Sequence, residues 1–403
     1  MPGCLPSHCY PYDAVASNAK GNALNTTNIH RADHCGSLLR PPMLRHARRE
    51  HALGRLDSAA LRTIEDQSIL EVLAMERAVG LTIYSDGEFR RKSWHHALEV
   101  AFVGIESDGP EYDRLPELRK VDLASNPELA PPNPVVVAPL RSKGRIAAHE
   151  AAFMQQHAPG AFKITLPSPA MVTRRWLSRQ AGRTAYPHYE DLIADVAKLL
   201  ADEAGKLAAE GVAYIQVDAP GYRRLMVRES VDQLRAAGID PKRELDMLIE
   251  ADNQILRSAK RAGSTAAIHI CHGTFILDGR GASGGGPVAY DPDLAAELYN
   301  RLEADTFLVE YTERGGGPES LQDAPKNKTY ALGVFNIRDP RIEDEDAVMR
   351  KIEAAAKFIP LDHLALCPNC GFSGMAAEAW VAPDVQKRKL ECLVATASKI
   401  WRE

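Results

Sequence analysis

The sequence predicts an α/β protein built as one (β/α)8 TIM barrel, with an insertion after the second strand. Two observations support this fold class. Short apolar segments alternate with helical ones from residue 31 onward, and the apolar segments number eight. A chain of 403 residues can form one large barrel. The predicted strands are Ala32 to Leu39, Leu81 to Asp86, Phe162 to Leu166, Ala213 to Val217, Ala266 to Cys271, Thr306 to Glu310, Tyr330 to Phe335 and Leu364 to Cys370.

Helices are predicted between these strands from their periodicity. Tyr189 to Glu210 carries apolar residues at helical spacing, and Gly211 provides a C-terminal stop. Ala59 to Val79 has the same character and precedes Gly80. Residues 101–160 interrupt the alternation with prolines, charges and a valine-rich run, so we expect an inserted hairpin and helix there. The predicted organisation is a flexible N-terminal arm over residues 1–28 and one catalytic domain over residues 29–403.

Composition argues against several classes of protein. The hydrophobic fraction of 45% and the charged fraction of 26% are ordinary for a soluble globular protein. A formal net charge of -5 without a long basic run argues against nucleic acid as a partner. No apolar run approaches the roughly 18 residues of a membrane span, and the first 28 residues lack a signal-peptide core. Seven scattered cysteines do not suggest a disulfide scaffold, so we expect a cytoplasmic protein with reduced thiols.

Polar residues gather at the carboxyl ends of the predicted strands, where barrel active sites lie. Side chains of His269 and Cys271 project to the same side, because strand residues two apart share a face. Imidazole and thiol are both zinc ligands. With Glu310 and Cys370 at further strand ends, these residues predict a mononuclear zinc site. The full set of strand-end residues is Ser37, Glu88, Ser168, Asp218, His269, Cys271, Glu310, Arg338 and Cys370.

Other interpretations of these residues stay open. A His-x-Cys pair alone is typical of a structural core. Cys367 and Cys370 form a CxxC motif that could be a redox pair or a zinc knuckle, although a redox pair is expected at a helix N-terminus and this one ends an apolar strand. Glu88, Asp218 and Ser37 could serve only as caps. The cysteines expected to lie outside the metal site are Cys4, Cys9, Cys35, Cys367 and Cys392.

Six motifs resemble those of the cobalamin-independent methionine synthase family, and they occur in family order. They are Asp-His-Cys-Gly-Ser-Leu-Leu-Arg-Pro at 33–41, Ser-Asp-Gly-Glu-Phe-Arg at 85–90, Ile-Gln-Val-Asp-Ala-Pro at 215–220, His-Ile-Cys at 269–271, Leu-Val-Glu at 308–310 and Pro-Asn-Cys-Gly-Phe at 368–372. The resemblance implies one barrel equivalent to the catalytic half of the long enzymes. It implies zinc held by His269, Cys271, Glu310 and Cys370. It also implies that Ser37, Glu88 and Asp218 hold the amino-acid end of homocysteine.

The activity implied by the resemblance is zinc-dependent methyl transfer to homocysteine, which forms methionine. Zinc lowers the pKa of a bound thiol enough to leave a thiolate at neutral pH. Two thiolates and one carboxylate give the site a net negative charge, which keeps electron density on a bound sulfur. Glu310, the harder ligand, is expected to yield its place to that sulfur. Glu88 and Asp218 could pair with an ammonium, while Ser37 and nearby backbone N–H groups could receive a carboxylate.

The folate side departs from the family pattern. The long enzymes have a Glu-Pro pair after the strand-end Asp and a further Glu, where this chain has Ala219 and Arg224. Their Asp-Ile-His-Ser turn, whose His is a candidate proton donor, is Asn-Ile-Arg-Asp at 336–339 here. Arg338 is always protonated and is therefore a poor general acid. Arg224, Arg314 and Arg338 would suit an anionic thiol or donor.

Three functions therefore compete. The first is methylation of homocysteine from a methylated folate or another methyl carrier. The second joins another thiol to a non-folate electrophile such as an epoxide or methylcobalamin, and the third is a catalytically silent zinc-binding barrel. Retention of Glu88 and Asp218 favours an amino-acid thiol and argues against a silent barrel. The expected partners are a small-molecule thiol and a methyl or alkyl donor.

Overall fold

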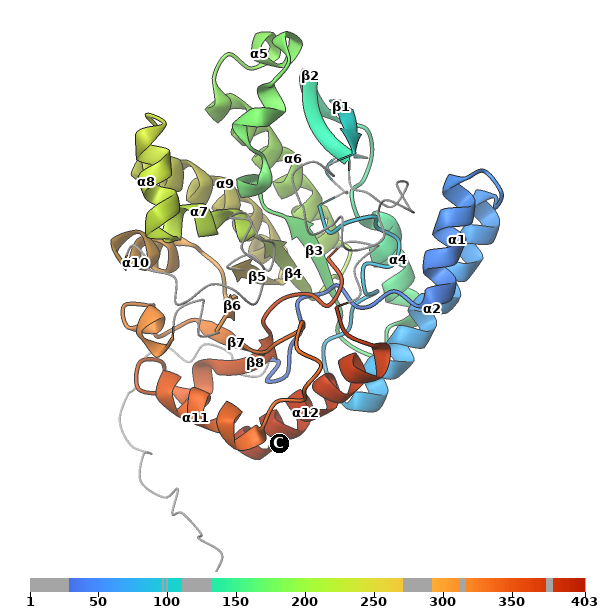
Figure 1. Ribbon diagram of the computed structural model, residues 1–403, viewed down its shortest axis with the longest axis vertical. Coiled ribbons are helices and arrows are strands. Elements are labelled where there is room, and N and C mark those ends of the chain that lie inside the picture. Colours follow the sequence, from blue (N-terminus) through green and yellow to red (C-terminus); the bar gives the residue numbers. More distant parts are fainter. Residues whose placement is uncertain are drawn as a thin grey trace, which may run out of the picture.

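A computed structural model describes residues 29–95, 98, 101–110, 132–270, 292–311, 317–374 and 380–402. A parallel sheet lies at the centre, with helices around it (Figure 1). The strands are β1 Phe102–Pro110, β2 Pro132–Ser142, β3 Lys163–Pro167, β4 Tyr214–Asp218, β5 Thr265–Ile270, β6 Thr306–Glu310, β7 Thr329–Phe335 and β8 Leu364–Pro368. The α-helices are α1 Pro42–Ala52, α2 Ser58–Val79, α4 Ala148–His157, α5 Gln180–Ala185, α6 Tyr189–Ala209, α7 Arg223–Met226, α8 Arg228–Ala236, α9 Pro241–Arg261, α10 Pro292–Arg301, α11 Glu345–Ala355 and α12 Pro383–Trp401. Short 3-10 helices are η4 Pro169–Met171, η5 Arg174–Leu177, η6 Pro220–Tyr222, η7 Pro318–Leu321 and η8 Leu361–His363.

The central sheet contains six strands in the order β3-β4-β5-β6-β7-β8, and each neighbouring pair is parallel. Every residue of β3, β4, β7 and β8 is buried, as expected for a parallel sheet covered on both faces. The predicted α/β architecture with a parallel sheet is confirmed. All six carboxyl ends therefore lie at one edge of the sheet.

The first two predicted strands are each reduced to a single bridge in the structure. Ala32 pairs in parallel with Leu366 of β8, and Tyr84 pairs in parallel with Phe162 just before β3. These two bridged segments flank the sheet at its opposite edges. The backbone N–H of Leu38 donates to the Gly87 carbonyl oxygen at 3.1 Å, but among the described residues no strand ladder joins the two segments, so a ladder does not close the predicted eight-stranded barrel.

Local interactions explain why these two segments do not extend into strands. Gly36 has a φ of 96° and Glu88 a φ of 59°, both in the left-handed region, which ends an extended conformation. The backbone N–H of Ser85 donates to the carboxylate of Glu76 at 3.3 Å, instead of to a neighbouring strand. Side-chain contacts thus replace ladder hydrogen bonds near Ser85.

Side chains from both bridged segments and from the central strands meet in one interior cluster. Its buried apolar members are Cys35, Ile83, Tyr214, Ala267, Leu308, Ala331, Ala365 and Cys367. β3 contributes the buried Lys163, whose Nζ lies 4.5 Å from the centre of the Tyr214 ring. Because the segments at both edges share one interior, the sheet is curled.

The stretch predicted to hold an insertion, residues 101–160, contains β1, β2 and α4 among its described residues. β1 and β2 form an antiparallel pair outside the central sheet (Figure 1). The pair is fixed to the α5 region, where the backbone N–H of Leu140 donates to the Tyr186 hydroxyl at 2.7 Å. In the same region, a Cβ on Gly182 would lie 2.5 Å from the Val136 carbonyl oxygen, so only glycine fits.

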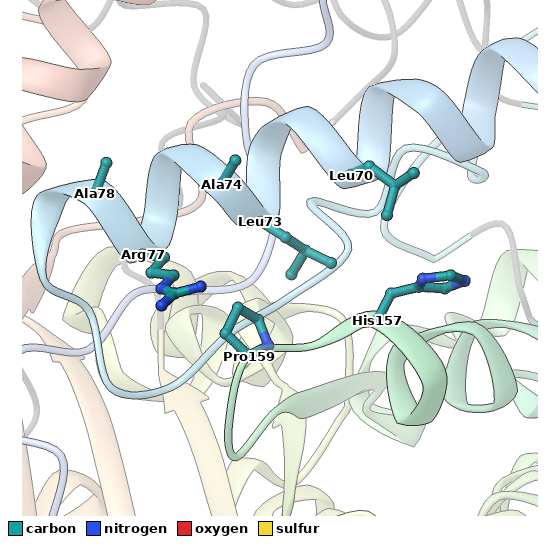
Figure 2. Close-up of a pocket in the computed structure, with 7 residues that line it drawn as sticks. All are labelled: Leu70, Leu73, Ala74, Arg77, Ala78, His157 and Pro159. Atoms are coloured by element: carbon teal, nitrogen blue, oxygen red, sulfur yellow. The ribbon is translucent and has the colours of Figure 1, made fainter.

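Helix α2 begins where the Asp57 side chain accepts a hydrogen bond from the backbone N–H of Ala60, and it ends at Gly80, whose φ is 90°. A groove lies between α2 and the end of α4 (Figure 2). It is beside the amino-terminal end of β3, at the rim opposite the strand carboxyl ends. The groove is lined by Leu70, Leu73, Ala74, Arg77, Ala78, His157 and Pro159.

None of the helices that the structure describes is long and apolar enough to cross a bilayer.

Candidate active site at the strand carboxyl ends

The carboxyl edge of the sheet carries most of the predicted site residues. Asp218 is the last residue of β4, His269 is the last but one of β5, and Glu310 ends β6. Asp218 and His269 are direct partners in the β4–β5 register. Cys370 follows β8 by two residues. Since neighbouring parallel strands end at one edge, the fold places these four residues on one rim.

The orientation of His269 is fixed by the neighbouring strand. Its side chain is 4% exposed, and its Nδ1 lies 3.2 Å from the carbonyl oxygen of Leu308 in β6. A carbonyl oxygen only accepts, so Nδ1 carries the proton and Nε2 has the lone pair. An imidazole that binds a metal through one nitrogen typically donates from the other in this way. Cys35, expected to lie outside the site, is a neighbour, with its Sγ 3.7 Å from Nδ1.

The loop after β8 links the end of β6 to the first bridged segment. The side-chain amide of Asn369 donates to Glu310 Oε1 at 3.4 Å, and Glu310 is 8% exposed. Cys370, a half-buried thiol, comes next in the chain. A Cβ on Gly371 would lie 1.9 Å from Ser37 Oγ, so the loop packs tightly against Ser37 and excludes a side chain at that position. Residues 369–371 therefore contact predicted site residues on both sides.

The four predicted metal ligands are only partly described. His269, Glu310 and Cys370 belong to the described residues, whereas Cys271 lies outside them. The described part of the chain contains no group of three or more His, Cys, Asp or Glu side chains that could hold a metal ion. His269, Glu310 and Cys370 therefore do not form such a group by themselves in the structure. The donor chemistry of these three suits zinc, because they offer an imidazole with a lone pair on Nε2, a carboxylate and a thiol.

A second group of buried polar residues surrounds Glu88. Glu88 is 2% exposed, and its Oε1 accepts from Thr165 Oγ1 at 2.6 Å and from Arg91 at 3.4 Å. Arg91 also forms an ion pair with Glu150 of α4 at 2.5 Å. Among the described residues, Glu88 Oε2 is buried and has no hydrogen-bond partner. The positive φ of Glu88 costs about 1–3 kcal/mol, and such strain clusters at functional positions.

Carboxyl groups outnumber cations around Glu88. Arg91 faces Glu150, Glu88 and Asp86. Burial raises the pKa of Asp86 to about 7, and the charge of Glu150 adds to the effect. Burial likewise raises the pKa of Asp218 to about 7; the charge of Glu88 adds to the shift, and His269 opposes it only when its imidazole is protonated. An ammonium ion bound beside these carboxyl groups would offset the excess of negative charge.

Ser168 does not belong to the group around Glu88. Its hydroxyl donates to Asp252 at 2.9 Å and accepts from the backbone N–H of Ala170 in η4. Tyr222 of η6 donates to the same Asp252 oxygen at 2.6 Å. Ser168 therefore fixes the loops after β3 and β4 to α9.

Arg338 lies on the turn that follows β7. Its guanidinium carbon lies 4.3 Å from the ring centre of Trp380, and its side chain is half-buried. The backbone N–H of Ile337 donates to Asn369 Oδ1 at 3.1 Å, which fixes this turn to the loop carrying Cys370. A stacked guanidinium suits a carboxylate or a phosphate, not proton transfer.

Arg224, another arginine considered for anion binding, is less well placed than Arg338. Arg224 donates to Glu244 Oε1 at 2.8 Å, and Arg174 binds both oxygens of the same carboxylate at 2.9 and 2.6 Å. Glu244 thus already partners Arg224. Arg314 lies outside the described residues.

Sequence reasoning missed several residues of the candidate site. Arg91 directly follows the motif at 85–90, and Thr165 lies two residues before Pro167, the last residue of β3, so both positions carried a local signal. Asn369, which contacts Glu310, lies inside the motif at 368–372. Glu150 had no such signal, because it comes from α4 and reaches Arg91 only in the folded chain.

Comparison with known proteins supports the resemblance. Residues 288–390 match the model of the catalytic domain of cobalamin-independent synthases. The uncharacterized protein YxjH of Bacillus subtilis (strain 168) is 27% identical over 92% of this chain and 95% of its own length. A 5-methyltetrahydropteroyltriglutamate–homocysteine methyltransferase of Cronobacter sakazakii is 25% identical over 91% of this chain and 43% of its own length. A B12-independent methionine synthase of Shewanella sp. W3-18-1, solved with selenomethionine, has a TM-score of 0.66 at 20% identity, covering 93% of this chain and 98% of that one.

Proposed function

We propose that this chain, which belongs to the cobalamin-independent methionine synthase family, is a zinc-dependent enzyme that methylates the sulfur of homocysteine to form methionine. The observation that carries the proposal is the buried, acid-rich group of side chains around Glu88, which lies near Asp218, the cross-strand partner of His269. A group with this charge suits the ammonium of an amino-acid thiol. The relative from Cronobacter sakazakii is named for this reaction.

The ammonium and the carboxylate of homocysteine would each be bound by the protein. Glu88 Oε2, a buried oxygen without a partner among the described residues, and Asp218 would receive the ammonium. Ser37 and nearby backbone N–H groups would receive the carboxylate. Asp218 is the cross-strand partner of His269. The thiol of homocysteine is a few bonds from its ammonium, so a substrate with its ammonium at Asp218 would have its thiol within reach of the candidate metal ligands.

Zinc would be held by His269, Cys271, Glu310 and Cys370. When bound, it would lower the pKa of the substrate thiol, which then stays a thiolate at neutral pH. The chain's own contribution is orientation. The Leu308 carbonyl holds His269 in the tautomer with a lone pair on Nε2, and Asn369 orients Glu310.

We also propose that the curled sheet is the core of a (β/α)8 barrel with an insertion after its second strand. The shared interior cluster supports this topology, since it includes side chains from both bridged segments. A contact between Lys163 of β3 and Asp33 of the first segment supports it too. Both residues are buried, so this contact joins the two edges of the sheet through its interior.

The methyl donor is the open part of the reaction. Arg338 stands at the family's candidate proton-donor position, and we propose that it binds an anionic group of the donor. This cation favours a negatively charged donor, whether a methylated folate or another electrophile. Alkylation of a thiol by a non-folate electrophile is therefore the second candidate function.

The direct test is an activity assay with purified protein, homocysteine and isotope-labelled methyl donors. Methyltetrahydrofolate carrying a glutamate tail and methylcobalamin would be compared, and labelled methionine would be measured. For a Glu88→Gln variant in this assay, Glu203→Gln is the matched control. Glu203 is a buried carboxylate on α6 that binds Arg145 at 2.6 Å and the Ala147 backbone at 3.0 Å. Failure of homocysteine to bind or react, with reaction of another thiol, would favour the second candidate.

A further inference from the structure

A continuous chain of hydrogen bonds runs through the interior of the sheet to Asp218. Gln216 lies two residues before Asp218 on β4, so both side chains share one face of the strand. The amide nitrogen of Gln216 donates to Asp218 Oδ1 at 2.7 Å and to the Cys35 carbonyl oxygen at 3.2 Å. The amide oxygen of Gln216 accepts from Lys163 Nζ at 3.0 Å.

Lys163 and the Cys35 carbonyl oxygen together fix which end of the Gln216 amide faces Asp218. An ammonium group only donates hydrogen bonds, so it must take the amide oxygen. The NH2 group of Gln216 is then directed at the carboxylate. Loss of Lys163 removes the donor to the amide oxygen and leaves the Cys35 carbonyl oxygen as the remaining contact that fixes the amide, so Gln216 and the Asp218 carboxylate are held less tightly.

Lys163 is itself held tightly. Its side chain is 1% exposed, and its ammonium contacts the Asp33 carboxylate and the His34 carbonyl oxygen in addition to Gln216. These contacts use all three of its N–H donors. Tyr214 completes the arrangement, because its hydroxyl donates to the other Asp33 oxygen at 2.9 Å. The ammonium therefore cannot move without losing a buried hydrogen bond.

We infer that Lys163 is a positioning residue for the substrate amine, because it orients Asp218 through the amide of Gln216. The inference rests on the proposed function, since it assumes that Asp218 receives the ammonium of an amino-acid thiol. Lys163 lies at the first position of β3 and Asp218 at the last position of β4. Lys163 therefore acts on Asp218 through Gln216 and does not itself touch the substrate.

The test compares the affinities of homocysteine and 4-sulfanylbutanoate, which keeps the thiol and the carboxylate but lacks the amine. Lys163→Met removes the ammonium donor. Gln216→Glu keeps an acceptor for Lys163 but presents an oxygen to Asp218. It is the second test variant and decides the result if Lys163→Met does not fold. Tyr214→Phe is the control, because it disturbs the same interior chain without touching Gln216.

Calorimetry should show that the native protein prefers homocysteine. Lys163→Met and Gln216→Glu should each reduce that preference by about ten- to hundred-fold, as expected for losing the alignment of one charge-assisted contact. Tyr214→Phe should keep the preference. If both variants lose affinity for the two thiols equally, Lys163 has only a structural role and the inference is wrong.

A different outcome separates this inference from the proposed function. If the native protein shows no preference for homocysteine, the proposed amine binding is wrong. The orientation claim is then decided by a crystal structure of Lys163→Met or, if that variant does not fold, of Gln216→Glu. An unchanged contact and position of Asp218 in that structure would overturn the inference, whereas a rotated residue 216 and a displaced Asp218 would support it.

Discussion

Replacement of Glu88 by Gln changes one atom at the centre of the buried polar group that is proposed to bind the substrate amine. The amide oxygen can still accept from Thr165 Oγ1, which contacts Glu88 at 2.6 Å, so the fold should tolerate the change. The amide nitrogen would occupy the position of Oε2, the buried oxygen without a partner among the described residues. It would then face the substrate ammonium with a donor in place of a negative charge.

The size of the effect follows from burial. Loss of one partner in a buried, hydrogen-bonded charge pair costs about 2–5 kcal/mol. Asp218 remains as a second carboxyl group near the ammonium, so the lower part of that range applies. About 2–3 kcal/mol corresponds to roughly 30- to 150-fold weaker binding of homocysteine.

Isothermal titration calorimetry with homocysteine and with 4-sulfanylbutanoate measures this effect. Glu88→Gln should weaken binding of the amino acid and leave binding of the amine-free thiol close to that of the native protein. Glu203→Gln should change neither. A folded Glu88→Gln protein that binds homocysteine with native affinity would refute the assignment of Glu88 to the ammonium.

Two further predictions concern Asp252 and Arg338. Burial raises the pKa of Asp252 from 3.8 to about 7, so the folded state retains a proton that the unfolded state releases, and stability is lost as pH rises from about 4 through 7. Relative to the native protein, Asp252→Asn should therefore gain up to about 4 kcal/mol in unfolding free energy between pH 4 and pH 8, measured by urea denaturation; a pH-independent difference would contradict this. Arg338→Met should raise the KM for an anionic methyl donor about ten-fold or more, with little change in homocysteine affinity. An unchanged donor KM would mean that Arg338 does not contact the donor.

The sequence was sufficient for the central sheet, because buried parallel strands appear as short apolar runs. The strand Thr306–Glu310 has the predicted bounds, and the other five central strands differ by one or two residues at their ends. The two bridged segments were predicted as full strands, since apolar content does not reveal the left-handed backbone of Gly36 and Glu88. Those conformations depend on contacts that only the folded chain provides.

The candidate site was predictable to the extent that it follows from strand ends. Asp218, His269 and Glu310 stand at the carboxyl ends of three successive strands, as the alternation of apolar runs and polar ends indicates. Lys163 and Glu150 were not predictable in this way. Lys163 begins an apolar strand and reaches Asp33 across the interior, and Glu150 reaches Arg91 from a helix of the region predicted as an insertion.

The zinc content of the purified protein tests the central claim most directly. Cys392 provides a matched control, because it is a half-buried thiol on α12 whose Sγ lies 3.6 Å from the Glu343 carbonyl oxygen. Elemental analysis should find about one zinc per chain in the native protein and in Cys392→Ser, and almost none in Cys370→Ser. Zinc retained at native levels in Cys370→Ser, or a native protein that methylates homocysteine at full rate without metal, would contradict the account.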